Sequence, residues 1–306
     1  MNPWFRSPRV GVALSGGGSR GLAHIGVLKV LAREGIPIHF LAGTSMGGVI
    51  AAGYAAGLGT AYLEEEALRM GKLRNLASLI DRSFSSQGLL KGQRIWEYFQ
   101  HQLNGATFAD LRIPLALVAV DLIKGEEVVL KEGSIADALR ATISLPGVFV
   151  PFRMNEWLLV DGGVLNNLPV DVVRRMGADI IIAVDVSARP QDYSQLARVG
   201  KHRPSPIEVE TLVETLLRTV GVMERQLVAQ KLAEARPEVL IQPMLDNDVN
   251  LWSGFAKVAE CIAAGASAAV AALPAIRQVL HSRLSFPHFG AVQRKVQTCS
   301  APLSKN

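Results

Sequence analysis

Short apolar runs alternate with longer helix-like segments along most of the chain. Each run has the length of one strand and is apolar at nearly every position, a pattern typical of strands that are buried on both faces. Strands that alternate with helices usually form parallel sheets. The sequence therefore predicts an α/β protein with a mostly parallel sheet covered by helices on both faces. The predicted strands are Val10–Leu14, Ile36–Ala42, Leu115–Val120, Leu158–Val160 and Ile180–Val186.

The segments between these runs carry the boundary signals of helices. The first predicted helix, Leu22–Glu34, is followed by Gly35-Ile36-Pro37, which stops it. Ser134 with Asp137 three positions later is typical of a helix start. Helical periodicity returns over Glu208–Ala235, after a polar stretch that contains prolines. The remaining predicted elements are the helices Met46–Ala56, Ala61–Leu73, Gln93–Leu103 and Ser134–Ala141 and the strand Glu126–Leu130.

Two glycine-rich turns lie near the start of the chain, and the second of them predicts a nucleophile. Its sequence, Gly43-Thr44-Ser45-Met46-Gly47, sets Ser45 on a sharp strand-to-helix bend. A Cβ at Gly43 or Gly47 would collide with the neighbouring strand and helix, and the serine would take a strained backbone conformation. The helix start behind Ser45 offers unpaired N–H groups and a positive dipole end to an anionic tetrahedral intermediate. This arrangement favours acyl transfer.

A serine nucleophile needs a base, and the sequence offers two kinds. His202 and His281 follow the serine in the chain order that α/β hydrolases use, but no local pattern singles out either. Asp161 stands out more clearly, because it ends the run Leu158–Val160 and precedes two glycines. Aspartate is a weaker base than histidine by about 2.6 pKa units, and burial in an apolar pocket recovers part of that difference.

The composition limits the compartment and the kind of site. The chain has 306 residues, 49% of them hydrophobic, and its two cysteines are Cys261 and Cys299. No disulfide framework, metal site or cofactor is therefore expected. Residues Met1–Arg9 lack the apolar stretch of a signal peptide, and the apolar window Cys261–Ile276 is shorter than the ~20 residues that cross a bilayer. The sequence predicts a cytoplasmic protein in which this window is a buried helix.

A formal net charge of +5 bears on the choice of partner. Basic residues gather at Arg189–Arg203 and near the C-terminal end. A positive face favours anionic lipid surfaces or acidic partners, so peripheral contact with a membrane is one expectation, and ordinary solvated charges explain the pattern equally well. Nucleic-acid binding is not expected, because no recognisable module or interleaved aromatic residues accompany the charge. The oligomeric state is left open.

Three motifs, in this order, resemble the patatin-like phospholipase family: Gly16-Gly17-Gly18-Ser19-Arg20-Gly21, Gly43-Thr44-Ser45-Met46-Gly47 and Asp161-Gly162-Gly163. The likeness covers roughly residues 8–187 and includes Ala141-Thr142, where the family commonly has Ala-Ser. It implies a three-layer α/β/α fold and a Ser–Asp dyad that hydrolyses acyl esters of phospholipids or lysophospholipids without a catalytic histidine.

The resemblance assigns roles to residues of this chain. Ser45 would be the nucleophile and Asp161 the base, and an acyl-enzyme would form on the serine. Arg20 would stabilise negative charge or hold its loop. The main-chain N–H groups that would bind the oxyanion are those of Gly16, Gly17, Gly18 and Met46. The supporting glycines are Gly21, Gly43, Gly47, Gly162 and Gly163.

The patterns and the resemblance together divide the chain into four parts. Residues 8–187 form the predicted catalytic core with the nucleophile turn and the Asp-Gly-Gly motif. Residues 188–206 form a basic, proline-containing loop or lid, and residues 207–283 form a C-terminal helical part packed on the same domain. Residues 284–306 are expected to be a flexible basic tail.

Two other functions stay open from the sequence. The spacing Gly16-x-Gly18-x-x-Gly21 matches a dinucleotide-binding fingerprint, but the second strand ends without the acidic residue that would bind the ribose. The other alternative is a protein that keeps the fold and binds a lipid surface or a partner without catalysis. Intact Ser45 and Asp161 favour the enzyme over this binding protein.

Overall fold

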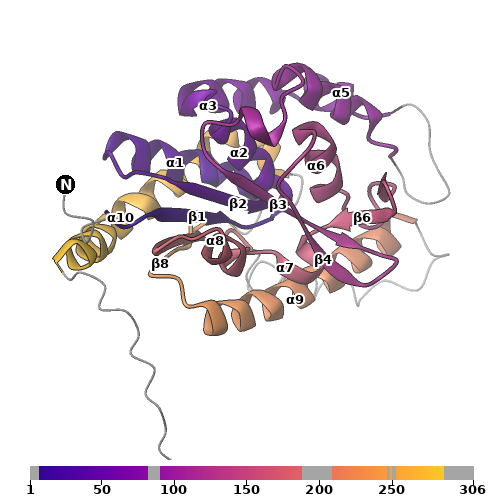
Figure 1. Ribbon diagram of the computed structural model, residues 1–306. Helices are drawn as coiled ribbons and strands as arrows, with labels where there is room; N and C mark the ends of the chain where they lie inside the picture. Colours follow the sequence, from indigo (N-terminus) through magenta and orange to yellow (C-terminus); the bar gives the residue numbers. More distant parts are fainter. Residues whose placement is uncertain (1–6, 82–89, 188–208, 247–248, 250–252, 286–306) are drawn as a thin grey trace, which may run out of the picture.

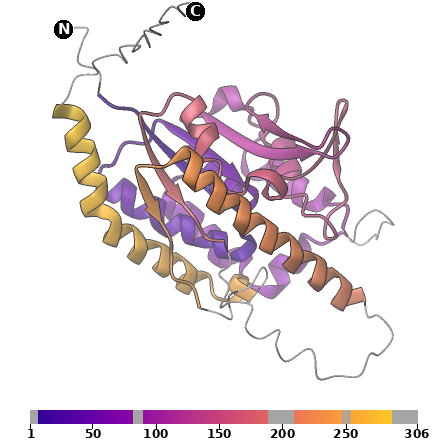
Figure 2. The same ribbon diagram turned by 90° about the horizontal axis from the view of Figure 1, so that it is seen from below.

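The structure is a computed structural model that describes residues 7–81, 90–187, 209–246, 249 and 253–285. Within these residues an eight-stranded sheet forms the middle layer, and helices cover both of its faces (Figure 1 and Figure 2). The predicted α/β fold with three layers is therefore confirmed. The predicted loop at 188–206 lies outside the described residues, and so does the predicted tail 284–306 except for Leu284 and Ser285, which belong to the last described helix.

The centre of the sheet is parallel and its β5–β6 edge is antiparallel. The strand order is β5-β6-β3-β2-β1-β7-β8, and β4 pairs with β3. The parallel strands are β1 (Val10–Leu14), β2 (Phe40–Thr44), β3 (Leu115–Asp121), β7 (Ile180–Val184) and β8 (Val239–Ile241). The antiparallel strands are β4 (Glu126–Leu130), β5 (Phe152–Met154) and β6 (Trp157–Asp161). Strands β5 and β8 have three residues each, too few for the sequence pattern to reveal them.

Most helices pack on one face of the sheet, and α8 and α9 pack on the other. The first group is α1 (Ala23–Arg33), α2 (Ser45–Ala55), α3 (Gly59–Met70), α5 (Gln93–Gln102), α6 (Ile135–Thr142) and α10 (Val258–Ser285). The second group is α8 (Val170–Arg175) and α9 (Val209–Ala235), with the single turn α7 (Gly163–Asn166) beside α9. The short helices between these elements are η1 (Gly18–Leu22), α4 (Leu73–Ser78), η2 (Phe108–Asp110) and η4 (Ser253–Ala256).

Side chains of the central strands divide between two cores because successive residues of a strand point to opposite faces. In β1, Val12 and Leu14 belong to the larger core under α1 and α10, whereas Ala13 belongs to the smaller core under α8 and α9. The same alternation runs through β3 and β7. This two-sided burial explains why these strands are apolar at nearly every position.

Two strands end at the same point of β3. Thr44, the last residue of β2, pairs with Val118, and Asp161, the last residue of β6, pairs with Ala119. Because β4 occupies the other edge of β3 over these positions, β2 and β6 must share one edge. They approach along it from opposite directions, since β2 is parallel and β6 antiparallel to β3. Their carboxyl ends therefore face each other.

Helix α10 is longer than the apolar window Cys261–Ile276, because the helix also includes the charged residues Glu260 and Arg277 that bound this window. Among the described residues it is the one helix that is long and apolar enough to cross a membrane, judged by length and composition alone. A helix packed on a domain core can pass the same test. Here Cys261, Ile262 and Ile276 are buried in the larger core.

The backbones of α1 and α10 touch where the two helices cross. A Cβ on Gly26 of α1 would overlap the carbonyl oxygen of Ile262, and a Cβ on Gly265 of α10 would overlap that of Ala23. Such close packing is possible only because both positions lack a side chain. The crossing attaches the C-terminal helix to the segment that begins directly after the first glycine-rich turn.

We expect Gly265→Ala to lower the free energy of unfolding by about 1–3 kcal/mol, as overpacked core substitutions do. Alanine is the better helix former by up to ~1 kcal/mol, so any loss reports the contact with Ala23. Denaturant unfolding measures the change, with Ser267→Ala at an exposed position of the same helix as the control. A Gly265→Ala protein as stable as this control would contradict the close crossing.

Candidate active site

Ser45 lies on the predicted bend between β2 and α2. Its φ of 52° is in the left-handed region, which is uncommon for a residue with a side chain. A Cβ on Gly43 would lie 2.6 Å from the Gly48 nitrogen, and a Cβ on Gly47 would overlap carbonyl oxygens at the end of β1. The predicted collisions at both glycines are thus present. The bend holds the half-buried Ser45 beyond the end of the sheet.

Asp161 lies at the end of β6, on the same edge of β3, and is 2% exposed. Its Oδ1 accepts a hydrogen bond of 2.8 Å from the Gly163 N–H, and its carboxylate accepts another from the Ser45 hydroxyl. Burial raises the pKa of Asp161 to about 6, and these two hydrogen bonds oppose the rise. The structure therefore brings together the two side chains that the sequence singled out.

The segment that follows α6 holds the backbones of both residues. The Ser45 N–H donates to Thr142 Oγ1 over 2.9 Å, and the Thr142 hydroxyl donates to the carbonyl of Val118 over 2.5 Å. The Asp161 N–H donates to the Ser144 carbonyl over 3.0 Å. The sequence marked Thr142 only as a departure from the Ala-Ser that the family commonly has. In the structure its buried hydroxyl fixes the strained serine, while Ser144 fixes the strand end that carries the aspartate.

Arg140 anchors this segment from the side of α6. Its guanidinium donates to Ser144 Oγ over 2.7 Å and to the carbonyls of Lys91 and Val150 over 2.6 and 3.0 Å. It also lies 4.9 Å above the ring of Phe149. Burial lowers the pKa of Arg140 to about 10, so the side chain stays charged at neutral pH. One buried cation thus fixes the loops on both sides of the Thr142–Ser144 segment.

The first glycine turn differs in one respect from the predicted oxyanion site. The Gly16 N–H donates to the Asn167 carbonyl over 3.1 Å, so it is not free to bind an oxyanion, and this part of the prediction was wrong. Glycine is still required there, because a Cβ would overlap Asn167 Oδ1 and lie 3.2 Å from the Ser45 Cβ. Within the described part of the chain, the N–H groups of Gly17 and Gly18 have no main-chain acceptor.

Arg20 joins its loop to two distant segments of the chain. Its Nε donates to the Val186 carbonyl and its Nη1 to the Val249 carbonyl, both over 2.9 Å, and the residue is 3% exposed. Of the two roles that the resemblance left open, these contacts favour the structural one. They connect η1 with the end of β7 and with the C-terminal third of the chain.

The histidines lie in other settings. His24 is fully buried in α1, and its Nε2 donates to the Ser15 carbonyl over 2.8 Å. Burial lowers the pKa of His24 to about 4, so the ring is neutral. His281 is exposed near the end of α10, with Nδ1 2.7 Å from the Arg277 carbonyl of its own helix, and His202 lies outside the described residues. Within the described residues, the base in contact with Ser45 is Asp161.

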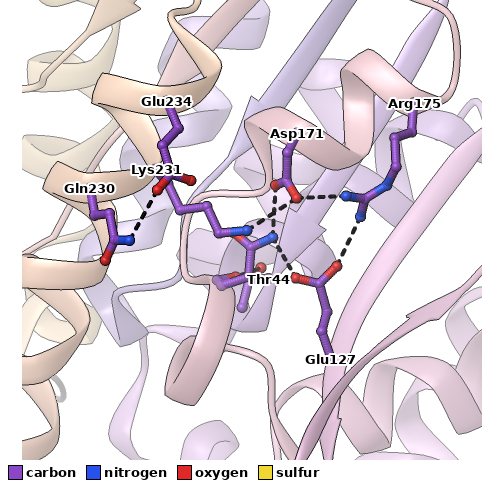
Figure 3. A network of polar contacts seen from close by, with 8 residues as sticks. Thr44, Glu127, Asp171, Arg175, Gln230, Lys231 and Glu234 are labelled. Carbon is purple, nitrogen blue, oxygen red and sulfur yellow. Dashed lines mark hydrogen bonds and ion pairs between the residues drawn. The ribbon is translucent and has the colours of Figure 1, made fainter.

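A polar network supports the turn that follows Asp161 (Figure 3). The Asn166 Nδ2 donates to Glu127 over 2.8 Å and to Asp171 over 2.9 Å, and the Thr44 hydroxyl donates to the Asn166 carbonyl. Asp171 also accepts from Lys231 of α9 over 3.1 Å. The network therefore joins the end of β2, the turn α7 and helix α9. No signal in the sequence indicated it, because its members come from five separate elements.

One further carboxyl reaches the site from α9. Glu224 is half-buried, and its Oε1 lies beside Gly163 and near Asp161. No sequence signal singled out Glu224, because it is one of many charged residues on a long helix. As for metals, no group of three His, Cys, Asp or Glu side chains within the described residues could hold an ion.

Comparison with known proteins gives a family match. The family model described as patatin-like phospholipase matches residues 12–174, a segment that runs from β1 into α8 and contains Ser45 and Asp161. Glu224 lies beyond its end. The matched segment amounts to more than half of the chain.

Relatives and a solved structure were found as well. An uncharacterized NTE family protein of Mycobacterium bovis is 38% identical over 183 residues, which cover 59% of this chain and 50% of that protein. Patatin-like phospholipase domain-containing protein 6 of Homo sapiens is 33% identical over 195 residues, 62% of this chain and 14% of that protein. The chain thus spans about half the length of the mycobacterial relative. VipD from Legionella pneumophila aligns with a TM-score of 0.44 and 13% identity, over 90% of this chain and 67% of that chain.

We expect Thr142→Val to slow the reaction of Ser45 with a fluorophosphonate probe by ~10-fold or more, because the loss of a buried hydrogen-bond acceptor costs ~1–3 kcal/mol. Thr142→Ser keeps the hydroxyl and should react nearly as fast as the wild type. Rates of labelling measured by mass spectrometry, with thermal unfolding to check the fold, decide the outcome. Equal rates for the valine and serine variants would show that the hydroxyl does not hold Ser45.

Proposed function

Because the chain belongs to the patatin-like phospholipase family, we propose that it is a serine hydrolase of lipid carboxylic esters, with Ser45 as nucleophile and Asp161 as base. The family match supports the substrate class. The observation that supports the residue roles most directly is the hydrogen bond from the Ser45 hydroxyl to the buried Asp161 carboxylate. It joins a hydroxyl on a strained bend to a base whose strength is raised by burial.

The raised pKa of Asp161 supports its role as the base. Its value of about 6 is close to the ~6.5 of an ordinary histidine, so burial removes most of the disadvantage of a carboxylate. At pH 7 the group is still largely ionised and able to accept a proton. A base with a pKa near the working pH is the most effective kind.

The reaction proposed is a two-step acyl transfer. Asp161 takes the Ser45 proton as the hydroxyl oxygen attacks the ester carbonyl, and an acyl-enzyme forms when the alcohol leaves. The oxyanion would be held by the N–H groups of Gly17 and Gly18, with the Met46 N–H at the start of α2 as the third donor. Water then releases the fatty acid. The substrate proposed is a phospholipid or a lysophospholipid.

Exposed apolar side chains support peripheral contact with a lipid surface. Leu216, Val222 and Met223 of α9 are 42–57% exposed, and Leu122 and Ile123 at the turn after β3 are 49% and 61% exposed. Helix α9 also carries Glu224, which reaches the site. An apolar surface on such an element suits a protein that takes its substrate from a lipid aggregate.

The two alternatives receive less support. A dinucleotide-binding loop would offer its N–H groups to a phosphate, but the Gly16 N–H is already paired with the Asn167 carbonyl. A binding protein without catalysis would have no use for a strained serine hydrogen-bonded to a buried carboxylate, both of which cost stability.

We expect a fluorophosphonate probe to label the wild type and not Ser45→Ala, with Ser267→Ala as the matched control at an exposed position.

Asp161→Asn should lower the rate of ester hydrolysis by ~100- to 10,000-fold, the usual contribution of a general base. Release of fatty acids from a mixed lipid panel, with Ser45→Ala as the blank, identifies the substrate. A wild type that neither labels nor hydrolyses in any membrane or detergent condition would favour the binding protein.

The ionisation of Asp161 predicts opposite pH effects on activity and stability. The value of kcat/KM should rise as the pH passes about 6, because only the ionised carboxylate accepts a proton. The pKa in the folded protein is above the unfolded value of 3.8, so the protonated form stabilises the fold and this contribution is lost between pH 3.8 and about 6. Above pH 6, Asp161→Asn should be more stable than the wild type by about 3 kcal/mol. Unfolding measured across this pH range would refute the assignment if the two proteins kept equal stability.

A further inference from the structure

We propose that Glu224 is a second catalytic carboxyl: it donates a proton to the oxygen of the leaving alcohol while Asp161 holds the proton of Ser45. This inference rests on the proposed ester hydrolysis and adds a residue to it. Glu224 lies outside the segment that the family model matches, so the role would belong to this chain and its α9 rather than to the common machinery.

The position of Glu224 is the first support. Three side-chain oxygens surround the position that a Cβ on Gly163 would take. Glu224 Oε1 is the nearest of them, and Asn167 Oδ1 and Asp161 Oδ1 follow at 3.1 and 3.2 Å. Asn167 Oδ1 in turn would overlap a Cβ on Gly16, a position 3.2 Å from the Ser45 Cβ. Gly163 thus leaves space in which the carboxyl of Glu224 approaches the oxygens that line the site.

Helix α9 holds Glu224 in this place. Val228, one turn later, is 3% exposed and packs in the smaller core, and Lys231, two turns later, donates to Asp171. Residues spaced by four and seven positions lie on one face of a helix, so all three point toward the sheet. The side chain of Glu224 is therefore directed at the site by packing on both of the following turns.

The protonation states of the two carboxyls suit the two roles. Burial, together with the nearby charge of Asp161, raises the pKa of Glu224 to about 8, whereas that of Asp161 is about 6. Between these values Asp161 is ionised and Glu224 is protonated. Two carboxyls whose environments separate their pKa values are the usual arrangement of a base and an acid in one site.

The charged groups of α8, the helix that packs beside α9 in the described part of the chain, are already paired. Asp171 and Arg175 of α8 form ion pairs with Lys231, with Glu127 and with each other. The turn α7, which also packs against α9, has no titratable side chain. Asp161 is therefore the charged neighbour that acts on Glu224 from the site.

The proposed reaction balances, because every proton that one group gives up is taken up by another. In the first step the Ser45 proton passes to Asp161, the bond between the acyl carbon and the alcohol oxygen breaks, and the Glu224 proton completes the alcohol. The Asp161 proton then passes to the Glu224 carboxylate, which has the higher pKa, so that Asp161 is ionised again. In the second step Asp161 takes a proton from water, and the hydroxide attacks the acyl-enzyme. The Asp161 proton then returns to the Ser45 oxygen as the fatty acid leaves. Both carboxyls end as they began.

The test compares two esters of the same fatty acid, one with an alkyl alcohol and one with nitrophenol. An alkoxide needs a proton to leave, whereas nitrophenolate leaves without one. Glu224→Gln should lower kcat for the alkyl ester by ~100-fold or more and change kcat for the nitrophenyl ester by less than ~3-fold. In the wild type, activity on the alkyl ester alone should fall above pH 8. Glu234→Gln, at an exposed position of the same helix, is the matched control.

The other outcomes separate the hypotheses. Equal losses on both esters would make Glu224 a structural residue, and no loss on either would leave Asp161 as the only acid and base; each result overturns the proposal. Fluorophosphonate labelling of Glu224→Gln at the wild-type rate shows that its Ser45 site is intact, because fluoride leaves without a proton. A wild type that hydrolyses neither ester and takes no label contradicts the proposed function instead.

Discussion

The candidate site depends on the meeting of two strands along one edge of β3. Thr44 ends β2 opposite Val118, and Asp161 ends β6 opposite Ala119, so the two strand ends are separated by one step of the β3 ladder. The chain directions bring carboxyl ends together there, and the residues that follow must turn out of the sheet. The Ser45 hydroxyl and the Asp161 carboxylate meet because hydrogen bonds of the sheet fix both strands.

Buried polar groups around this junction are stabilised by specific partners. Thr142 accepts a hydrogen bond from the backbone of Ser45, and Ser144 accepts one from the backbone of Asp161. Arg140 in turn donates to the side chain of Ser144. A buried donor or acceptor without a partner lowers the stability of the fold. The contacts that satisfy these groups are the same ones that hold the backbones of the nucleophile and the base in place. For Asp161, in contrast, burial destabilises the ionised form of the carboxyl. The pKa of the group is therefore raised, which makes the carboxylate a stronger base.

The sequence predicted the central parallel strands, most helices and the pair Ser45 and Asp161, because these follow from local patterns: apolar runs, glycine turns and residues at strand ends. The family resemblance is confirmed by the match over residues 12–174. What the sequence could not supply depends on contacts between distant segments. The pairing of the Gly16 N–H with Asn167 and the approach of Glu224 are of this kind. Helix α10 was underestimated because the apolar window ends at the charged residues Glu260 and Arg277, although the helix includes both.

The C-terminal third of the chain completes the first glycine-rich turn. The Gly254 N–H donates to Ser19 Oγ over 3.0 Å, the Val249 carbonyl accepts from Arg20, and Gly265 lies against the backbone at Ala23. Helix η1 and the first residue of α1 thus have contact partners in a region that the family match does not reach. The segment that the family model matches is therefore smaller than the domain in which it is packed, because the domain also includes these C-terminal contacts.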